Sequence, residues 1–340
     1  MMPAKTKNSM IQLDFSKEIH IKKLPRKEEW QENIVDFLEE WYSDSETITT
    51  KTSGSTGTPK NIELTKSAMI RSAAMTGEFL NLKENDSALL CMPSLYIAGK
   101  MMLVRAIVWK LNLFCIKPVS HPLENLTKEF VFSAMTPMQV ENSLNKLHLI
   151  KKLIVGGAQI SSPLLDQLKN LPTDIYESFG MTETISHIAL KKVSGNQNFP
   201  VFRVLPGTKI RQDERGCLCI LPSFLTEEIR TNDSVSILSE NEFEWLGRID
   251  NVINSGGIKI FPEKVEKQLK TIIADREFII SSKKDSLLGN KVILLIAGEK
   301  IPELEQKIDE FPFENKYEKP KEIIYIEHFT KTPTGKIVRM

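Results

Sequence analysis

Residues 46–60 read ETITTKTSGSTGTPK. The first positions are rich in β-branched residues and favour a β-strand. In the remainder, glycine lets backbone N–H groups approach an anion, the hydroxyls add hydrogen-bond donors and Lys60 adds a positive charge. The pattern predicts a phosphate-binding loop between a strand and a helix, made of Thr52, Ser53, Gly54, Ser55, Thr56, Gly57 and Lys60.

Two other interpretations of this loop are a flexible Ser/Gly linker and a Walker A loop. A linker is disfavoured because the segment lies between a β-branched strand and a predicted helix. A Walker A loop requires Gly-x-x-x-x-Gly-Lys-[Ser/Thr], whereas Lys60 follows Pro59. A P-loop kinase or GTPase is therefore disfavoured.

Helix-like and strand-like segments alternate around the loop. Trp30, Ile34, Phe37 and Trp41 recur at helical spacing and predict an amphipathic helix. The hydrophobic pattern then predicts helices near 65–80, 99–110, 137–147 and 162–170, and strands at 87–93, 113–118, 131–135, 151–157 and 174–180. Such alternation predicts an α/β fold with a layered core in a large N-terminal domain.

The pattern changes near residue 201. Residues 201–246 lose helical periodicity and show short strand-like runs with turn residues, which predicts a β-rich part of the large domain. From Asp250 onward, the order strand, helix, two strands, helix and strand predicts a small α+β domain. We therefore expect a large domain at 1–249 and a small one at 250–340, with the boundary near Asp250.

Charge and hydropathy limit the partners of this protein. The 340 residues carry 45 basic and 44 acidic side chains, a net charge of +1, so no general field attracts nucleic acid or an anionic membrane. The N-terminus lacks an apolar segment, and Lys100, Arg105 and Lys110 interrupt the apolar run at 86–116. We expect a soluble, cytoplasmic protein that binds neither nucleic acid nor a membrane.

The cysteines indicate a reducing compartment. Cys91, Cys115, Cys217 and Cys219 form no Cys-x-x-Cys pair, and no nearby histidines complete a metal site. We expect buried thiols that pack in the core. The sequence leaves the oligomeric state open, a homo-oligomer included.

Five further motifs follow the phosphate loop in a fixed order. They are Gly156-Gly157-Ala158, Glu177-Ser178-Phe179-Gly180-Met181-Thr182-Glu183, Thr231-Asn232-Asp233, Gly247-Arg248-Ile249-Asp250 and Pro333-Thr334-Gly335-Lys336. Together with TSGSTGTPK, they resemble the signatures of the adenylate-forming (AMP-binding) superfamily of acyl-CoA synthetases, peptide-synthetase adenylation domains and luciferases. The resemblance covers the chain from about residue 48 to its end.

This resemblance implies an acid–thiol ligase that uses ATP, Mg²⁺ and coenzyme A, and forms an acyl-AMP intermediate. It makes Lys336, Thr182 and Glu183 catalytic residues, with Glu183 as the magnesium ligand. The phosphate loop would hold the β- and γ-phosphates. The nucleotide would be bound by Ser178, Phe179 and Gly180 at the adenine, Asp233 at the ribose hydroxyls and Arg248 at the ribose or phosphates.

The resemblance also implies that the small domain is a mobile lid. Lys336 would bridge the substrate carboxylate and the α-phosphate during adenylation, and the lid would then rotate about a hinge at Asp250. Rotation would present Gly256 and Gly257, whose missing side chains let a pantetheine arm pass close to the backbone.

The acid pocket is expected at Pro93-Ser94-Leu95-Tyr96-Ile97-Ala98-Gly99 and at Gly156, Gly157 and Ala158. Tyr96 stands where the family usually has histidine, and Asn232 where it usually has glycine. Only some 50 residues precede the phosphate loop, and this compact form resembles the short o-succinylbenzoate-CoA ligases of menaquinone biosynthesis. Such a diacid needs a partner for its second carboxylate, for which Lys100 and Arg105 are candidates.

Other functions remain open at this point. The acid could be another aryl or fatty acid, and the acceptor could be a carrier-protein thiol. A nucleotide-binding protein without chemistry is a third interpretation, which the completeness of the motifs disfavours. A small-molecule carboxylic acid is the expected partner in the first two cases.

Overall fold

The computed structural model describes residues 10–51, 61–195, 201–273 and 276–330, together with Ile337 and Arg339. The chain divides into two compact units, residues 1–209 with 221–229 (unit 1), and residues 210–220 with 230–340 (unit 2). This division groups residues 230–249 with the C-terminal part, whereas the sequence suggested a boundary near Asp250. The hinge at Asp250 concerns motion and stays a prediction.

Unit 1 is built on a mixed β-sheet. The strands follow the order β1 (Ile11–Asp14), β5 (Asn112–Cys115), β4 (Ser87–Leu90), β6 (Phe130–Met135), β7 (Ile150–Val155), β8 (Asp174–Gly180), β9 (His187–Lys192) and β10 (Phe202–Val204). The five from β5 to β8 are parallel, and β1, β9 and β10 run antiparallel to their neighbours. The predicted α/β class is confirmed.

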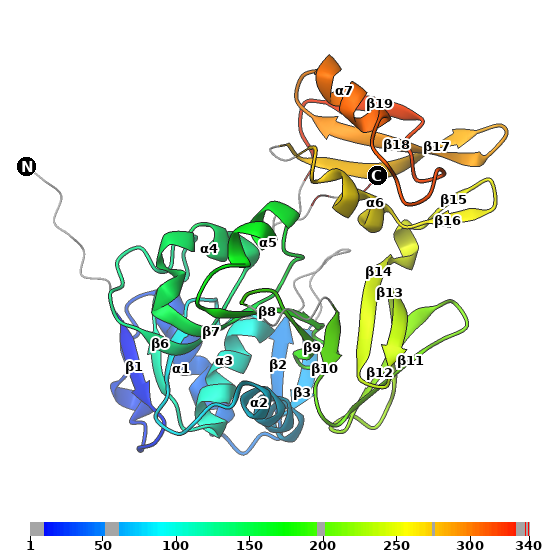
Figure 1. Ribbon diagram of the computed structural model, residues 1–340. Helices are drawn as coiled ribbons and strands as arrows, with labels where there is room; N and C mark the ends of the chain where they lie inside the picture. Colours follow the sequence, from blue (N-terminus) through cyan, green and yellow to red (C-terminus); the bar gives the residue numbers. More distant parts are fainter. Residues whose placement is uncertain are drawn as a thin grey trace, which may run out of the picture. The chain divides into compact units, whose positions relative to one another are not determined.

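Helices cover both faces of this sheet (Figure 1). Along each strand, alternate side chains point to opposite faces, so Leu90 joins one core cluster and Leu89 the other. The first face carries α1 (Glu29–Trp41), α2 (Lys66–Leu80) and α3 (Ile97–Val108), after the short helix η1 (Ile21–Lys23). The second carries α4 (Pro137–Glu141), η2 (Leu144–Leu149) and α5 (Ser162–Leu168).

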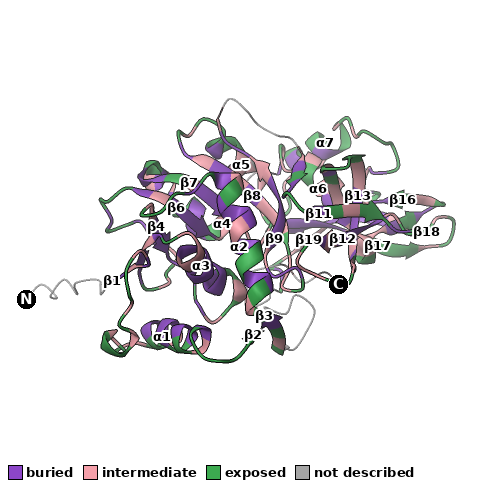
Figure 2. Ribbon diagram, turned by 90° about the horizontal axis from the view of Figure 1, so that it is seen from below, coloured by how far each residue is buried: buried purple, intermediate pink, exposed green. Residues whose placement is uncertain are grey.

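Helix α1 has the two-sided character that the sequence predicts. Trp30, Ile34, Phe37 and Trp41 are all buried, and its remaining positions carry most of its charge. Figure 2 shows buried and exposed positions alternating around its turns. The predicted amphipathic helix is therefore confirmed.

Helix 137–147 is shorter than the hydrophobic pattern suggested. Helix α4 ends at Glu141, and a 3-10 turn follows from Leu144. Asn142 and Ser143 interrupt it, and Asn142 Nδ2 donates to the Ser120 carbonyl 3.2 Å away. Such residues bond to the backbone outside helices and weaken them.

A small hairpin precedes α2. Strands β2 (Thr47–Lys51) and β3 (Asn61–Thr65) pair antiparallel, with Lys51 opposite Asn61. The predicted helix near 65–80 is present as α2, but the strand β3, which precedes it after the phosphate loop, was not predicted. Alternate side chains of β3 face the core: Leu64 is buried in it and Ile62 packs against it. The loop itself, residues 52–60, lies outside the described residues.

Unit 2 contains a group of four hydrogen-bonded strands, a hairpin and a three-stranded sheet. Strands β14 (Glu242–Arg248), β13 (Ile229–Ser239), β12 (Cys217–Pro222) and β11 (Thr208–Gln212) lie in that order. After η3 (Ile249–Asn251) come the hairpin β15 (Ile253–Ser255) and β16 (Ile258–Ile260), then α6 (Pro262–Leu269), β17 (Phe278–Asp285), β18 (Gly289–Ala297), α7 (Pro302–Asp309) and β19 (Glu322–Ile326). Helices α6 and α7 share a core cluster with the β17–β18–β19 sheet.

All four cysteines are free and buried, as expected. Burial raises the pKa of the Cys91 thiol to about 12 and raises the pKa of Cys115 as well, so neither is a thiolate at neutral pH. None of the helices formed by the described residues is long and apolar enough to cross a membrane.

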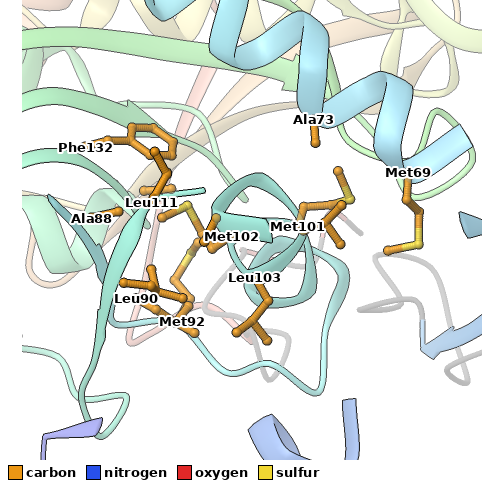
Figure 3. Packing of buried hydrophobic residues seen from close by; sticks show 14 of the residues in the cluster. Met69, Ala73, Ala88, Leu90, Met92, Met101, Met102, Leu103, Leu111 and Phe132 are labelled. Carbon is orange, nitrogen blue, oxygen red and sulfur yellow. The ribbon is translucent and has the colours of Figure 1, made fainter. Parts of the chain in front are cut away.

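Helices α2 and α3 approach each other closely. In Figure 3, Met101 of α3 extends towards α2, while Met102 lies beside Leu111 and Phe132. A Cβ atom at Gly77 of α2 would lie 2.0 Å from Trp109 Nε1. That indole donates to the Ala73 carbonyl at 3.1 Å, so it cannot move without losing its hydrogen bond.

We expect Gly77→Ala to destabilise unit 1 by about 1–3 kcal/mol, because it overpacks the contact with Trp109. Without the clash, the same change in a helix stabilises by roughly 0.5–1 kcal/mol. Urea unfolding measures the difference. In a Trp109→Leu background, Gly77→Ala should cost less, and an equal loss in both backgrounds would contradict the clash.

Candidate functional site

The carboxyl ends of four parallel strands lie at one edge of the unit 1 sheet. Strands β4, β6, β7 and β8 are hydrogen-bonded in that order, so the segments that follow them lie side by side. Tyr96 follows β4, Thr136 follows β6, Gly156 follows β7 and Gly180 ends β8. Open α/β sheets bind ligands at this edge. Three of the predicted motifs are thus brought together.

The Gly156 and Ser178 motifs are in direct contact. Ser178 Oγ donates to the Val155 carbonyl at 3.1 Å, and a Cβ atom at Gly156 would lie 2.5 Å from that hydroxyl. Glycine is therefore required at position 156 by the side chain of the neighbouring strand. Phe179, on the next position of β8, packs edge-on against Phe202 with ring centroids 5.6 Å apart.

The turn after β8 is strained. Ile185 has a φ of +66°, which a β-branched residue rarely adopts. The buried Thr184 hydroxyl holds the turn: it accepts from the Met181 N–H at 3.0 Å and lies 2.8 Å from the Ser186 carbonyl. Glu183 is exposed on this turn, and no ion pair joins it to any other described residue. Thr182 is half-buried beside it.

A buried polar cluster lies next to this turn, which we call the Arg105 cluster. It consists of Ser72 and Thr76 on α2, Arg105 on α3, and Ser186 and His187 at the start of β9. Arg105 Nη2 donates to Ser186 Oγ at 3.1 Å and lies 3.5 Å from His187 Nδ1. Ser186 Oγ is 2.8 Å from Ser72 Oγ, and His187 Nε2 is 3.1 Å from Thr76 Oγ1.

Arg105 is a buried cation that lacks an acidic partner. Its exposed fraction is 3 %, and within the described ranges no carboxylate forms an ion pair with it. Its Nε is buried and has no hydrogen-bond partner among the described residues. Burial lowers the pKa of the guanidinium to about 9, so it remains charged at neutral pH. An unpaired buried charge is costly, so this arrangement is suited to an anionic ligand.

Lys100, the other predicted cation, lies elsewhere on α3. Its Nζ is 4.0 Å from Glu40 Oε2 and 5.1 Å from the centroid of the Phe37 ring, both on α1. Burial lowers the pKa of Lys100, and the charge of Glu40 opposes that shift. The structure therefore gives Lys100 partners on a helix and does not bring it to the Arg105 cluster.

Tyr96 is half-exposed at the N-terminus of α3. It precedes the first helical turn, where a Cβ atom at Gly99 would lie 2.2 Å from the Pro93 carbonyl oxygen. The backbone of the predicted acid segment therefore folds tightly onto α3 and requires this glycine. The neighbouring Ser94 hydroxyl is buried and has no partner among the described residues.

In unit 2, strand register places Asp233 opposite Arg248. The two residues are direct partners of the β13–β14 ladder, with Arg248 Nη1 3.8 Å from Asp233 Oδ2. Trp245 Nε1 donates to Asp233 Oδ1 at 2.9 Å. Burial raises the pKa of Asp233, while the Trp245 hydrogen bond and the Arg248 charge lower it. The predicted ribose-binding carboxylate thus shares its oxygens with two neighbours.

Asn232 contacts the predicted hinge residue. Its Nδ2 donates to both carboxylate oxygens of Asp250, at 3.1 and 3.2 Å, and Arg248 Nη2 lies 2.8 Å from Asp250 Oδ2. Arg215 Nη1 in turn donates to Asn232 Oδ1 at 3.0 Å. The hydrogen bond from Arg248, followed by that from Asn232, lowers the pKa of Asp250 against the effect of its partial burial. The departure from glycine at position 232 therefore adds a side chain that holds Asp250.

Gly256 and Gly257 form the two-residue turn between β15 and β16. Their φ angles are +56° and +80°, as a type I′ hairpin turn requires. Gly256 N–H also donates to the Leu288 carbonyl at 2.9 Å. Turn geometry accounts for both glycines, and a role in passing a ligand stays a prediction.

Several predicted residues lie outside the described part of the chain. They are Thr52, Ser53, Gly54, Ser55, Thr56, Gly57, Lys60 and Lys336. Among the described residues, no group of three or more histidines, cysteines and carboxylates could hold a metal ion. A metal here would need ligand oxygens from a bound substrate, beside an exposed carboxylate such as Glu183.

The sequence did not single out Ser72, Thr76, Ser186, His187 or Trp245. The hydrogen bonds of the first four join residues far apart in the chain, as with Thr76 and His187, which are 111 positions apart, and that of Trp245 reaches Asp233 on the neighbouring strand. Only the place of Ser186 and His187 directly after the Thr182-Glu183 motif could have drawn attention to them.

Comparisons with known proteins find relatives of this chain. A family model described as AMP-binding enzyme matches residues 3–220, more than half of the chain. A 2-succinylbenzoate–CoA ligase from Listeria monocytogenes is 27% identical over 338 residues, covering 89% of this chain and 71% of the relative. One from Lactococcus lactis is 24% identical over 315 residues, covering 85% and 68%.

Solved structures are similar as well. An acyl-CoA synthetase (AMP-forming)/AMP-acid ligase II-like protein from Dyadobacter fermentans is 36% identical, with a TM-score of 0.67 and coverage of 96% of this chain and 97% of that chain. An o-succinylbenzoate coenzyme A synthetase from Bacillus subtilis, in complex with ATP and magnesium ion, is 20% identical with a TM-score of 0.71. The match covers 85% of this chain and 68% of that chain. At this level of identity, the similarity establishes a shared fold only.

The Arg105 cluster predicts a pH dependence of stability. Burial, and then the charge of Arg105, lower the pKa of His187 well below its ordinary value of about 6.5. The unfolded chain binds this proton first, so the free energy of unfolding should fall as the pH drops below about 6.5, by up to about 1.4 kcal/mol per pH unit. Urea unfolding curves, measured from about pH 7.5 to about pH 5 in steps of about half a pH unit, test this expectation.

His187→Gln keeps a hydrogen-bonding side chain but cannot titrate, so this part of the pH dependence should disappear. His121→Gln is the matched control, because His121 is exposed. An identical pH profile for the His187→Gln variant and the wild type would contradict the assignment.

Proposed function

Because the chain belongs to the AMP-binding enzyme family, we propose that it activates an aromatic diacid of the o-succinylbenzoate type with ATP and transfers the acyl group to coenzyme A. The enzyme class and α/β fold predicted from the sequence agree with the family match. The observation that supports a diacid is the buried guanidinium of Arg105, which forms no ion pair with any described residue.

The chemistry has two steps. A carboxylate is a poor electrophile, so one of its oxygens first attacks the α-phosphorus of ATP, the bond to pyrophosphate breaks, and acyl-AMP forms. A thiolate then attacks the acyl carbon, the acyl–oxygen bond breaks, and AMP leaves with both electrons of that bond. Both steps accumulate negative charge, which positioned cations and N–H donors stabilise.

We assign the first step to residues that the motifs single out. Lys336 neutralises the attacking carboxylate and the α-phosphate, and the loop 52–60 binds the outer phosphates. Ser178, Phe179 and Gly180 receive the adenine. Asp233 accepts hydrogen bonds from the ribose hydroxyls, with Arg248 beside it. The buried carboxylate of Asp233 already accepts a hydrogen bond from Trp245, which keeps it oriented.

Glu183 fits a magnesium ligand, with Thr182 beside it. Its carboxylate is exposed, and no ion pair joins it to another residue of the described part of the chain. When bound with ATP, Mg²⁺ neutralises phosphate charge and aligns the leaving pyrophosphate. The strained turn that carries Glu183 fixes where this carboxylate stands.

We assign the second carboxylate of the acid to Arg105. The guanidinium has five donors in a planar fork, of which Nη2 is used by Ser186 and Nε has no partner in the described chain. A carboxylate would supply the charge that this buried cation lacks. Tyr96, Gly156, Gly157 and Ala158 follow neighbouring parallel strands and border the acid on the same edge.

For the second step, we propose that Gly256 and Gly257 let the pantetheine arm pass. Their positive φ angles favour glycine, so neither position of this hairpin turn carries a side chain. Coenzyme A is favoured as the acceptor by the names of the similar ligases, and a carrier-protein thiol is the alternative. Binding of a nucleotide without chemistry is the least supported function.

Acid-dependent exchange of labelled pyrophosphate into ATP tests the proposal. With Mg²⁺, we expect exchange with o-succinylbenzoate and little with benzoate, a medium-chain fatty acid or amino acids. Lys336→Ala should reduce it to a small but measurable residual rate, and added coenzyme A should yield the thioester. Exchange with a different acid would support acyl-AMP formation but contradict o-succinylbenzoate as the substrate. Absence of exchange with every acid would contradict the proposed enzymatic activity.

Arg105→Met should raise the KM for o-succinylbenzoate about 10- to 100-fold, since a hydrogen-bonded charge contributes about 1.5–3 kcal/mol. The KM for benzoylpropionate, which is the same acid without its ring carboxylate, should change little. Lys100→Met, on the same helix and also buried, is the matched control and should leave both values nearly unchanged. Equal effects of Arg105→Met on the two acids would exclude its role in binding the second carboxylate.

A further inference from the structure

An ion pair ties the end of the chain to the core of unit 2. Arg339 Nη2 lies 2.7 Å from Glu266 Oε2 on α6, and Arg339 Nη1 donates to the Ile280 carbonyl at 3.0 Å. The other oxygen of Glu266 accepts from the Ile280 N–H at 2.7 Å. The guanidinium therefore bonds to α6 and β17 together.

The electrostatics show that this pair is partly desolvated. Burial lowers the pKa of Arg339, but the hydrogen bond and charge of Glu266 outweigh it and raise the pKa. Burial raises the pKa of Glu266, and Arg339 opposes that shift. Each group thus keeps the other charged, and removing one would leave a buried charge alone.

An apolar contact anchors the same stretch of chain. Ile337 packs against a cluster of Ile279, Ile293, Leu295 and Phe329 on the sheet face opposite α6. Ile337 is thus held on one face of the sheet, and Arg339, two positions later, by α6 and the Ile280 carbonyl of β17. An apolar contact alone tolerates a shift of the chain, whereas a bonded guanidinium fixes the register.

The position of this anchor matters because of what precedes it. Lys336 is bonded directly to Ile337 and is three residues from Arg339. A chain extends at most about 3.6 Å per residue, so the Cα of Lys336 lies within about 11 Å of the Cα of Arg339. Whatever fixes Arg339 therefore limits the reach of the lysine.

The anchor also connects to the Gly247-Arg248-Ile249-Asp250 motif. Glu263, one turn before Glu266 on α6, has Oε1 3.8 Å from Arg339 Nη2 and accepts from Asn251 Nδ2 at the same oxygen. A Cβ atom at Gly247 would lie 2.5 Å from Glu263 Oε2. Two neighbouring carboxylates of α6 thus lie between the predicted hinge segment and the chain end.

We propose that Arg339, held by Glu266 and Glu263, is a positioning residue that sets where Lys336 acts during adenylation. The proposal rests on the function proposed above, in which Lys336 serves the first step and not the second. Arg339 itself touches no substrate. Its loss should therefore impair acyl-AMP formation and spare thioester formation from acyl-AMP that is supplied ready-made.

The experiment measures the two half-reactions separately in Arg339→Met and Arg339→Lys. We expect pyrophosphate exchange to fall about 10- to 100-fold in Arg339→Met, since small misplacements of a reacting group cost this much. The rate of thioester formation from synthetic o-succinylbenzoyl-AMP and coenzyme A should stay within about twofold of the wild-type rate. This change is smaller than the loss of about tenfold or more expected when a reacting group is misplaced. Arg339→Lys, which keeps the charge, should recover part of the exchange.

The matched control is Lys319→Met, which removes another ion pair of unit 2, 2.6 Å from Asp309. It should leave both half-reactions unchanged. In a Lys336→Ala background, Arg339→Met should cause no further loss of exchange, because the two residues act as one unit. A further loss of tenfold or so, added to that of Lys336→Ala, would overturn the proposal.

A second readout does not depend on activity. Trypsin should cleave after Lys336 several-fold faster in Arg339→Met than in wild type or Lys319→Met, as followed by intact mass, because the anchor opens more often. An unchanged cleavage rate would overturn the anchor. Equal losses in both half-reactions would reduce Arg339 to a structural role, and absence of exchange in the wild type would refute the proposed function first.

Discussion

The parallel pairing of β4, β6, β7 and β8 is the constraint on which the rest of unit 1 depends. Parallel strands end at a common edge, so each segment that follows them is brought beside its neighbour. The strands need helical crossovers, and these cover both sheet faces. Glycine at 156 and 180 is then required by contacts with Ser178 and with the backbone at His187. The packing around this edge therefore leaves no room for a side chain at these two positions.

Burial without an acidic partner gives Arg105 its character. The guanidinium is held by neutral groups, Ser186 and His187, which orient it and leave its charge unneutralised by any described carboxylate. Lys100, five residues earlier on α3, has Glu40 and Phe37 as partners. Each residue rotates an α-helix by about 100°, so side chains five positions apart point about 140° away from each other. The two cations therefore face different surroundings. Position on the helix therefore separates a candidate ligand-binding cation from a structural one.

Unit 2 uses register and buried charge in a similar way. The antiparallel β13–β14 ladder places Asp233 opposite Arg248, and Asn232 reaches Asp250 from the adjacent position. Glu263 of α6 accepts a hydrogen bond from Asn251, directly after Asp250, and both Glu263 and Glu266 contact Arg339. Buried ion pairs add little net stability, so their best-attested use is to fix a unique arrangement. Asn251, next to the predicted hinge residue, and Arg339, three positions after the predicted catalytic lysine, are held in this way.

The sequence by itself determined the α/β class, the order of the elements and the family, because hydrophobic periodicity and motif order are local properties. It also named candidate site residues, since Ser178 and Asp233 lie in recognisable motifs. It missed β3 and overextended the helix at 137–147, where pairing and side-chain bonds to distant backbone decide. Only the tertiary structure gave Arg105 its neighbour His187, His187 its partner Thr76, and Arg339 its partner Glu266. These contacts join residues about 70 to 110 positions apart, and no local pattern records which distant side chains will share a buried site.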